Sequence, residues 1–584
     1  MKLGRNDPCS CGSGLKFKKC CGTASAPLLV EKQAGAETLM ARSVEAHQSG
    51  QLEEAAQGYR QVIKATPGNG NALHLLGVVE YQLGNFSTAI DLIKKAIPYL
   101  PGIAEVHINL GAAYMDSGQF DEAAACFNKA LSIQPLHPKA YMNLGKLFSE
   151  RLILDKALES YRQALSVSPN NMVAYSSFLF ILLYDPKQTL ASLAEAHQEW
   201  AQLVSRQVQG YTDYKNGRNP ERILRIGYVS PDFGRHPVGY FLLPVLKAHD
   251  REKVRVYCYS NRIKEDEITG RLKNSADEWL NIAGKDDREI ARQIRNDRID
   301  ILVDLAGHTA GNSLSLFAIH PAPLQVTWAG YMGTTGLRQM DYILTNRHAT
   351  PPGTEKYYSE RFLFLPDDYI CYEPPDYAPP VAGLPALTNG VVTFGCFNNL
   401  AKVNEKVVSL WARLLKRLPG SRLVLTTKQL DNAEICRRYA EMFEARGVAD
   451  RVHLEGSLPH KSLLEKYHRI DISLDPFPYT GALSTLESLW MGVPVVTLAG
   501  EIMVGRQSLC HVVAVGMNEL IAKTEEDYLR IAEELANDLP RLSSLRSGLR
   551  GRMKETVCDE FRFTASLEAA FQDIWRNWCI STAN

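Results

Sequence analysis

A 34-residue period restricts the fold of this 584-residue chain more than any other feature of its sequence. Prolines recur at that interval, and each follows an alanine and a large residue at fixed distances. The members of these three sets are Pro67, Pro101, Pro135 and Pro169; Ala55, Ala89, Ala123 and Ala157; and Tyr59, Ile93, Phe127 and Tyr161. Such a period is typical of paired helices that pack at one small residue and stack into a solenoid.

Small residues also recur where the two helices of each repeat would cross. They are Gly77, Gly111 and Gly145, with Ser43 at the equivalent position of the first repeat. The whole pattern resembles the tetratricopeptide family. This resemblance implies four repeats over about 36–171 and a degenerate fifth that begins at 171, so the predicted solenoid domain is 36–184.

The concave face of the predicted solenoid carries two asparagines. Position six of each repeat points to that face, and it is Asn109 and Asn143 in the third and fourth repeats, but Ala41 and Leu75 in the first two. A side-chain amide both donates to and accepts from an extended peptide backbone. Asn109 and Asn143 are therefore predicted to bind extended peptides of a protein partner, and a dimerisation or packing surface stays open as the alternative.

Four of the twelve cysteines lie within the first 21 residues. Two thiolates one residue apart, a glycine-containing turn and two adjacent thiolates can complete a tetrahedral zinc site. The predicted ligands are Cys9, Cys11, Cys20 and Cys21. The segment 1–22 resembles the SEC-C zinc motif, which implies a structural site with no open position. Incidental reduced cysteines are the alternative interpretation. Nearby lysines and Arg5 would suit an acidic protein partner.

The composition argues against several classes of function. Lys and Arg together number 65, as do Asp and Glu, so the formal net charge is zero and nucleic-acid binding is not favoured. The longest apolar run, 178–183, is far shorter than the roughly 20 residues that cross a bilayer. The beginning of the chain is polar and lacks the apolar core of a signal peptide. We therefore expect a cytoplasmic protein without a membrane span.

After a polar connector at 185–221, strand-like runs alternate with helical stretches such as 286–297. This alternation is typical of parallel sheets with crossover helices. A proline-rich linker at 366–388 separates two such regions, so two Rossmann-like domains are predicted, 222–385 and 388–584. The predicted strands are 225–229, 254–259, 299–304 and 324–328 in the first, and 391–395, 422–425, 452–454, 470–474 and 493–497 in the second.

Several catalytic motifs are absent from the sequence. It has no Gly-x-Gly-x-x-Gly, Walker A, His-Glu-x-x-His or Gly-x-Ser-x-Gly motif, and no Asp-x-Asp pair to hold a metal-bound diphosphate. A diphosphate would have to be neutralised by protein groups. Candidates are Lys402, after a predicted strand, and the turn 480–485, which opens a helix containing Glu487. The first turn of a helix presents free N–H groups to phosphate.

Five segments resemble the catalytic region of the O-GlcNAc transferase and SPINDLY family, and the similarity extends over roughly 222–580. They are 229–238, 304–312, 320–328, 397–402 and 489–494. The resemblance implies a GT-B fold, which is two Rossmann-like domains with a cleft between them. It also implies an inverting glycosyltransferase that needs no metal or cofactor for catalysis. Family members usually move GlcNAc from UDP-GlcNAc to serine or threonine hydroxyls of proteins.

The same resemblance assigns roles to individual residues. Lys402 corresponds to the lysine on the donor diphosphate. His236 corresponds to an active-site histidine that is either the general base or a group that positions the sugar. His308 is the second candidate base, with Asp304 orienting it or binding the sugar. The predicted donor-binding residues are Asn399, Lys402, Gly481, Ser484, Thr485, Glu487 and Arg506.

Departures from the family pattern leave the base and the sugar of the donor undetermined. The turn reads Gly-Ala-Leu-Ser-Thr at 481–485 and so lacks one hydroxyl that bacterial relatives have. Leu463 replaces a histidine near the nucleobase, with His460 one turn upstream, and Met332 interrupts a Tyr-Pro-Gly-Thr sequence. Two alternatives remain: a transferase with another donor or acceptor, such as GDP-fucose or a glycan, and a binding scaffold whose transferase half has decayed.

Overall fold

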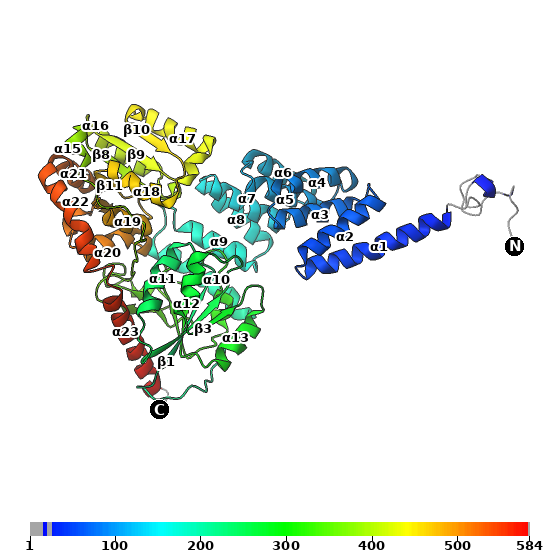
Figure 1. The fold of residues 1–584 in the computed structure, drawn as a ribbon, viewed down its shortest axis with the longest axis horizontal. Helices are drawn as coiled ribbons and strands as arrows, with labels where there is room; N and C mark the ends of the chain where they lie inside the picture. The colour runs from blue at the N-terminus through cyan, green and yellow to red at the C-terminus, as the bar shows by residue number, and fades with distance from the viewer. Residues whose placement is uncertain (1–6, 8–15, 20–25, 582–584) are drawn as a thin grey trace. The chain divides into compact units, whose positions relative to one another are not determined.

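A computed structural model describes residues 7, 16–19 and 26–581. The chain divides into two compact units, Met1–Pro169 and Asn170–Asn584 (Figure 1). The predicted zinc ligands Cys9, Cys11, Cys20 and Cys21 lie outside the described residues, so the zinc site stays a prediction.

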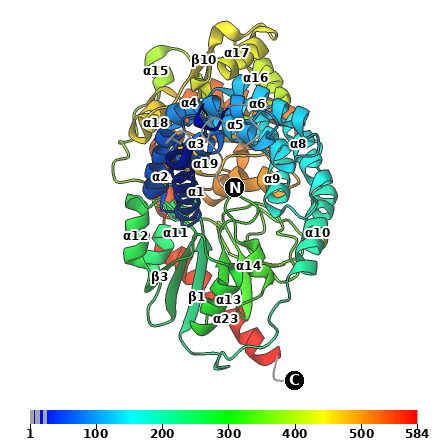
Figure 2. The same ribbon diagram turned by 90° about the vertical axis from the view of Figure 1, so that its right-hand side faces the viewer.

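The first unit is an array of antiparallel helix pairs, which confirms the predicted tetratricopeptide architecture (Figure 1, Figure 2). Its α-helices are α1 (Ala26–Gln48), α2 (Leu52–Ala65), α3 (Gly70–Gln82), α4 (Phe86–Ala96), α5 (Ala104–Asp116), α6 (Phe120–Ile133), α7 (Pro138–Glu150) and α8 (Leu154–Val167).

The helix crossings lie where the period predicts them. A Cβ atom added at Gly111 would lie 2.5 Å from the ring of Phe127, and one at Gly145 would lie 2.8 Å from Tyr161. The alanines four positions before these aromatic residues, Ala123 and Ala157, are fully buried. Each of these two crossings thus places a glycine of one helix against a large side chain of the next, which is why the glycines and the large residues recur with the same period.

The second unit contains a seven-stranded parallel sheet in the order β3-β2-β1-β4-β5-β6-β7. All four predicted strands are present. Three short strands, β3, β6 and β7, were not predicted. The bounds are β1 (Leu224–Ser230), β2 (Val254–Ser260), β3 (Glu278–Asn281), β4 (Ile301–Asp304), β5 (Leu324–Thr327), β6 (Tyr342–Thr345) and β7 (Arg361–Phe364).

A second parallel sheet has the order β10-β9-β8-β11-β12-β13. Its five predicted strands are present, and β13 is an addition of two residues. The bounds are β8 (Thr393–Cys396), β9 (Arg422–Thr426), β10 (Val452–Glu455), β11 (Ile472–Leu474), β12 (Val495–Leu498) and β13 (Ile521–Ala522).

Each sheet reverses its strand order once, and right-handed crossovers therefore place helices on both of its faces. The helices of this unit are α9 (Met172–Leu182), α10 (Leu190–Gln207), α11 (Pro237–Ala248), α12 (Glu267–Ser275), α13 (Asp287–Asn296), α14 (Leu314–Ala318), α15 (Pro385–Asn389), α16 (Glu405–Arg417), α17 (Ala433–Glu444), α18 (His460–Lys466), α19 (Leu483–Trp490), α20 (Gln507–Ala514), α21 (Glu525–Asn537), α22 (Leu539–Lys554) and α23 (Glu560–Ser581).

The predicted connector at 185–221 contains helix α10, which packs on the first sheet domain. His197 of α10 lies 2.7 Å through its Nε2 atom from the hydroxyl of Tyr331, and the ring of Trp200 meets that of His308 edge-on at 4.4 Å. Helix α9, predicted to be part of the solenoid, also belongs to the second unit. The apolar and aromatic residues of α10, such as Leu193, Trp200 and Val204, are buried by this packing, although the segment as a whole is polar.

The C-terminal helix α23 returns to the first sheet, although its sequence continues the second Rossmann-like domain. Phe571 and Trp575 are fully buried in the core that includes β1, β2 and α11 (Figure 1, Figure 2). Glu568 lies 2.9 Å from Nδ1 of the buried His249. The prediction that 388–584 forms one domain with this helix is therefore wrong for α23, because its apolar face is covered by the first domain.

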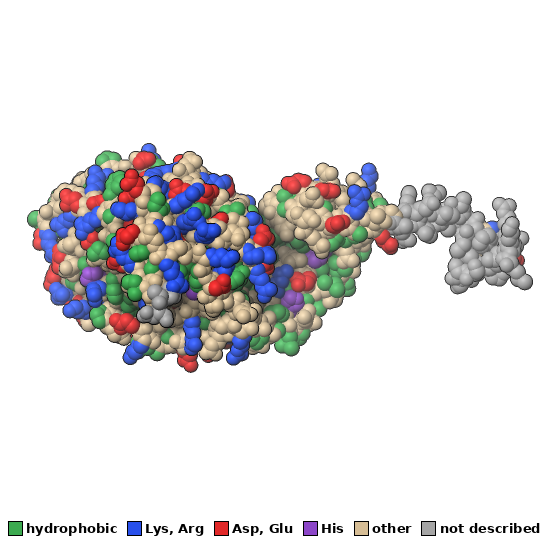
Figure 3. Space-filling model, turned by 90° about the horizontal axis from the view of Figure 1, so that it is seen from below, with side chains coloured by type: hydrophobic (Ala, Val, Ile, Leu, Met, Phe, Trp, Pro, Cys, Tyr) green, Lys and Arg blue, Asp and Glu red, His purple; other side chains and the backbone are tan. Residues whose placement is uncertain are grey.

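Basic and acidic side chains are interspersed over the described surface that faces the viewer in Figure 3. This distribution agrees with the zero formal net charge. Within the described part of the chain, none of the helices combines the length and apolar character that a bilayer crossing requires.

Candidate active site

The predicted site residues follow the strands at which each sheet reverses its order. The reversal falls between β1 and β4 in the first sheet and between β8 and β11 in the second. The loops after such neighbouring strands run in opposite directions and open a crevice at the carboxyl edge of the sheet. His236 follows β1, His308 follows β4, Lys402 follows β8 and Gly481 follows β11.

Lys402 ends the short 3₁₀ helix η4 (Leu400–Lys402) and extends to the turn that precedes α19. Its Nζ atom donates to the carbonyl oxygen of Thr480 at 2.7 Å and lies 4.4 Å from the ring centre of Tyr479. Burial lowers the pKa of Lys402 to about 8, and the neighbouring Asp475 and Cys396 only partly oppose this shift. The ammonium group of Lys402 is therefore held against the turn 478–482 and is easier to deprotonate than an exposed lysine.

Gly481 gives the turn its tight shape. Its N–H donates to Oδ1 of Asp475 at 2.8 Å, and an added Cβ atom would lie 2.4 Å from Oγ1 of Thr485. Helix α19 begins two residues later, and Ala482 at its N-cap position supplies no side-chain cap. The first N–H groups of this helix are therefore suited to an anion from outside the chain.

The predicted hydroxyls lie in two different environments. The Oγ atom of Ser484 donates to Oδ1 of Asn398 at 2.7 Å, at the mouth of the turn. Thr485 is buried, and its Oγ1 lies 2.7 Å from the hydroxyl of Ser508. Ser484 can therefore turn toward a ligand by giving up one contact, whereas Thr485 holds α19 against α20.

Asn399, predicted to contact the donor, is exposed and accepts the N–H of Ala401 and the amide of Gln429 through its Oδ1 atom. The buried Asn398 meets Ser484 instead. Sequence reasoning missed Asn398 because two adjacent asparagines give no sign of which one faces inward.

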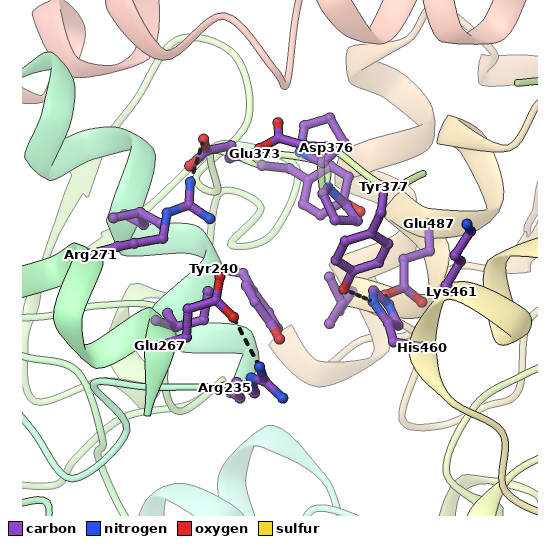
Figure 4. Close-up of a pocket in the computed structure, with 16 residues that line it drawn as sticks. Arg235, Tyr240, Glu267, Arg271, Glu373, Asp376, Tyr377, His460, Lys461 and Glu487 are labelled. Atoms are coloured by element: carbon purple, nitrogen blue, oxygen red, sulfur yellow. Dashed lines mark hydrogen bonds and ion pairs between the residues drawn. The ribbon is translucent and has the colours of Figure 1, made fainter. Parts of the chain in front are cut away.

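A cavity of about 550 Å³ lies between the two Rossmann-like halves (Figure 4). Arg235 and Glu267 line it from the first half. On the opposite side, Nε2 of His460 lies 2.7 Å from Oε1 of Glu487, and Nδ1 of His460 lies 2.7 Å from the Tyr377 hydroxyl. Glu487 raises the pKa of His460 by this hydrogen bond. Tyr377 comes from the proline-rich linker, and its aromatic ring among prolines was the signal that sequence reasoning passed over.

His236 is the N-cap residue of α11, and its side chain is 42% exposed. Its Nδ1 atom accepts the N–H of Val238 at 3.3 Å and lies 3.6 Å from Oδ2 of Asp232. Burial lowers the pKa of His236 more than Asp232 raises it, which favours the neutral ring. A neutral imidazole has one N–H, so a ring that accepts a hydrogen bond at Nδ1 carries its proton on Nε2. To act as a base, Nε2 would have to be free of a proton. The proton would then be on Nδ1 and would face Asp232.

His308 does not reach the cavity. It is buried, with Nδ1 3.2 Å from the hydroxyl of Ser176 and Nε2 2.9 Å from the carbonyl oxygen of Thr335, and burial lowers its pKa well below the usual value. Asp304 does not orient His308, because its carboxylate accepts from Thr327 and from backbone N–H groups. This geometry argues for a packing role and against a base role.

Arg506 ties the two halves together. Its guanidinium donates to the carbonyl oxygen of Gly500 at 2.7 Å and to that of His348, which follows β6 of the first sheet. Arg506 is thus engaged by these two carbonyl groups, whereas Lys402 contacts the carbonyl oxygen of Thr480. Its role as a donor contact stays a prediction.

In the first unit, Asn109 and Asn143 both line a hollow of about 270 Å³. The Nδ2 atom of Asn109 lies 2.9 Å from Nε2 of His74, and its Oδ1 accepts from Lys139 at 3.5 Å. The two asparagines therefore share one surface, as the period predicts, but the amide of Asn109 already has partners within the repeats.

Comparison with known proteins identifies the family. The sequence profile of glycosyl transferase family 41 matches residues 158–374 and 383–567, which is more than half of the chain. The chain belongs to glycosyltransferase family 41. Profiles of the tetratricopeptide repeat match 41–102, 104–136 and 138–171, and the SEC-C profile matches 5–23.

Among curated proteins, the chain is similar to plant SPINDLY proteins, described as probable UDP-N-acetylglucosamine–peptide N-acetylglucosaminyltransferases. It is 41% identical to the Petunia hybrida protein over 394 residues, which is 66% of this chain and 42% of that protein. It is 42% identical to the Arabidopsis thaliana protein over 397 residues, which is 66% and 43% of the two chains. The chain thus spans less than half the length of these relatives.

A solved structure covers more of the chain. A lysine-to-methionine mutant of the Thermobaculum terrenum O-GlcNAc transferase matches with a TM-score of 0.74 and 35% identity, over 95% of this chain and 99% of that one. Together with the family match, this similarity confirms the predicted fold: helical repeats followed by the two parallel α/β domains of a GT-B glycosyltransferase.

Proposed function

We propose that this chain transfers GlcNAc, or a related sugar, from a UDP-sugar to serine or threonine hydroxyls of protein acceptors. The observation that carries this function is the ammonium of Lys402, held on the turn before α19 beside an uncapped helix N-terminus. Both groups favour a diphosphate, and the cavity between the halves, which Leu483 at the start of α19 lines, has room for a nucleoside and an acceptor residue.

The proposed roles follow from what each group can do. Lys402 stabilises the negative charge that grows on the departing nucleoside diphosphate, an interaction that strengthens as the sugar–phosphate bond breaks. Ser484 and the first N–H groups of α19 hold the diphosphate, and Glu487 holds the nucleoside from the cavity wall. His236 either takes the proton of the acceptor hydroxyl or positions the sugar through its Nε2 proton.

The test is to incubate the full chain with UDP-GlcNAc, other UDP-sugars and GDP-fucose, with and without candidate acceptor proteins. We expect release of UDP from UDP-GlcNAc, and an intact-mass increase of the acceptor by one sugar. Faster release of GDP from GDP-fucose would replace the proposed donor. Release of neither nucleotide above the level of a Lys402→Met control would favour the scaffold alternative.

We further propose that the hollow in the repeats binds extended acceptor segments. The double variant Asn109→Ala, Asn143→Ala should raise KM for a long protein acceptor several-fold while leaving donor hydrolysis unchanged, because the lost contacts are remote from the reaction. Steady-state kinetics with a long and a short acceptor test this. Equal losses with both acceptors would mean that the asparagines, including the Asn109–His74 contact, serve the fold instead.

We also propose that the SEC-C segment binds one structural zinc ion through Cys9, Cys11, Cys20 and Cys21. Elemental analysis should find one zinc per full chain and none in a chain that starts near Ala24. Turnover on short peptides should be nearly equal for the two proteins. Equal zinc contents would contradict the assignment.

A further inference from the structure

Tyr479 lies between Lys402 and a helical segment from much earlier in the sequence. Its ring centre is 4.4 Å from Nζ of Lys402. The ring of Tyr184, which follows α9, lies 4.6 Å away with 35° between the planes, and Phe180 of α9 packs edge-on against Tyr184 at 5.7 Å. An unbroken row of side chains thus connects α9 to the turn that holds Lys402.

The chemistry of this contact suits a lysine that must keep its charge for a ligand. An aromatic face attracts an ammonium group by its electron density but brings no formal negative charge. A carboxylate at the same place would neutralise the charge before a diphosphate arrived. The flexible lysine stem needs some restraint, and the carbonyl oxygen of Thr480 provides only one hydrogen bond at 2.7 Å.

We propose that Tyr479 is a positioning residue that fixes the Lys402 ammonium for the donor diphosphate, and that Tyr184 holds the Tyr479 ring in place. This inference rests on the proposed role of Lys402. It makes the segment after α9 a structural part of the donor site, although α9 itself resembles a helix of the repeats.

The contact depends on the ring of Tyr479 and not on its hydroxyl, so conservative and non-conservative variants should differ. Tyr479→Phe keeps the aromatic face, whereas Tyr479→Leu fills the space without it. Tyr184→Ala leaves Tyr479 intact but removes its support. Phe148→Leu is a matched control, because it removes another lysine–aromatic contact, with Nζ of Lys156 5.5 Å from the ring, within the repeats.

The readout is binding of UDP by calorimetry to the full chain, measured across neutral and alkaline pH. The charged form of Lys402 binds the diphosphate, so affinity should fall as the pH rises through its pKa of about 8. The other titratable groups that act on Lys402 are Asp475 and the Cys396 thiol, which all the variants retain. Thermal melts establish that each variant is folded.

We expect Tyr479→Leu to bind UDP about tenfold more weakly at neutral pH. As the pH is raised, the affinity of this variant should begin to fall at a lower pH than the affinity of the unchanged chain. Tyr184→Ala should change in the same direction by less, and Tyr479→Phe and Phe148→Leu should match the unchanged chain. If Tyr479→Leu keeps the original affinity and pH profile, or if Tyr479→Phe loses as much, Tyr479 does not position Lys402. If the unchanged chain does not bind UDP, the proposed transfer from a UDP-sugar fails as well.

Discussion

Lys402→Met is expected to reduce kcat by about 10²–10³ with little loss of folding stability, because it removes charge where the leaving diphosphate becomes more negative. Methionine approximates the volume of the lysine stem, so the packing against Tyr479 should persist. The hydrogen bond to the Thr480 carbonyl, the ammonium charge and its attraction to the Tyr479 ring are lost. Single-turnover and steady-state rates of UDP release measure the effect.

The pH profile provides a second signal for the same residue. Burial lowers the pKa of Lys402 to about 8, so the active, charged form predominates below that value and is lost above it. The kcat/KM of the unchanged enzyme should therefore decline on the alkaline side, and Lys402→Met should lack that limb. As a control, Lys466→Met removes a half-buried lysine that pairs with Glu455, and its rate should stay near that of the unchanged enzyme. A folded Lys402→Met enzyme with unchanged kcat would contradict the mechanism and direct attention to Arg506.

Variants of His236 should reduce the rate by about 10²–10⁴ if this histidine is the general base. A base must be neutral, so activity would rise with pH through the pKa of His236, which burial places below its usual value. That acidic limb should vanish in the variants. If His236 instead positions the sugar through its Nε2 proton, the rate falls while the shape of the profile is kept.

The choice of substitution matters because His236 also caps α11 through Val238. His236→Asn keeps a good N-cap but cannot act as a base near neutral pH, whereas His236→Ala loses both properties. Equal rate losses in the two variants would assign the effect to the chemistry. A loss confined to His236→Ala, accompanied by a lower melting temperature, would assign it to the cap and contradict both active-site roles.

The sequence predicted the architecture of this protein because the signals for it are local and repeated. The 34-residue period places Gly111 against Phe127, and alternating strands and helices are typical of parallel sheets with crossovers. The site loops were also predictable, because Lys402 follows a predicted strand and the turn around Gly481 opens a predicted helix, whose first N–H groups suit a phosphate. Family resemblance then supplied the chemistry of these loops.

Tertiary structure alone decided which of these residues meet. Asn398 and Asn399 are adjacent in the chain, and only the packing turns the first toward Ser484. His308 looked like a candidate base, yet α9 and α10 cover it and occupy its ring. The contact between Tyr184 and Tyr479 joins residues almost 300 positions apart. Sequence patterns report local spacing, whereas the surroundings of a side chain depend on chain segments that folding brings together from a distance.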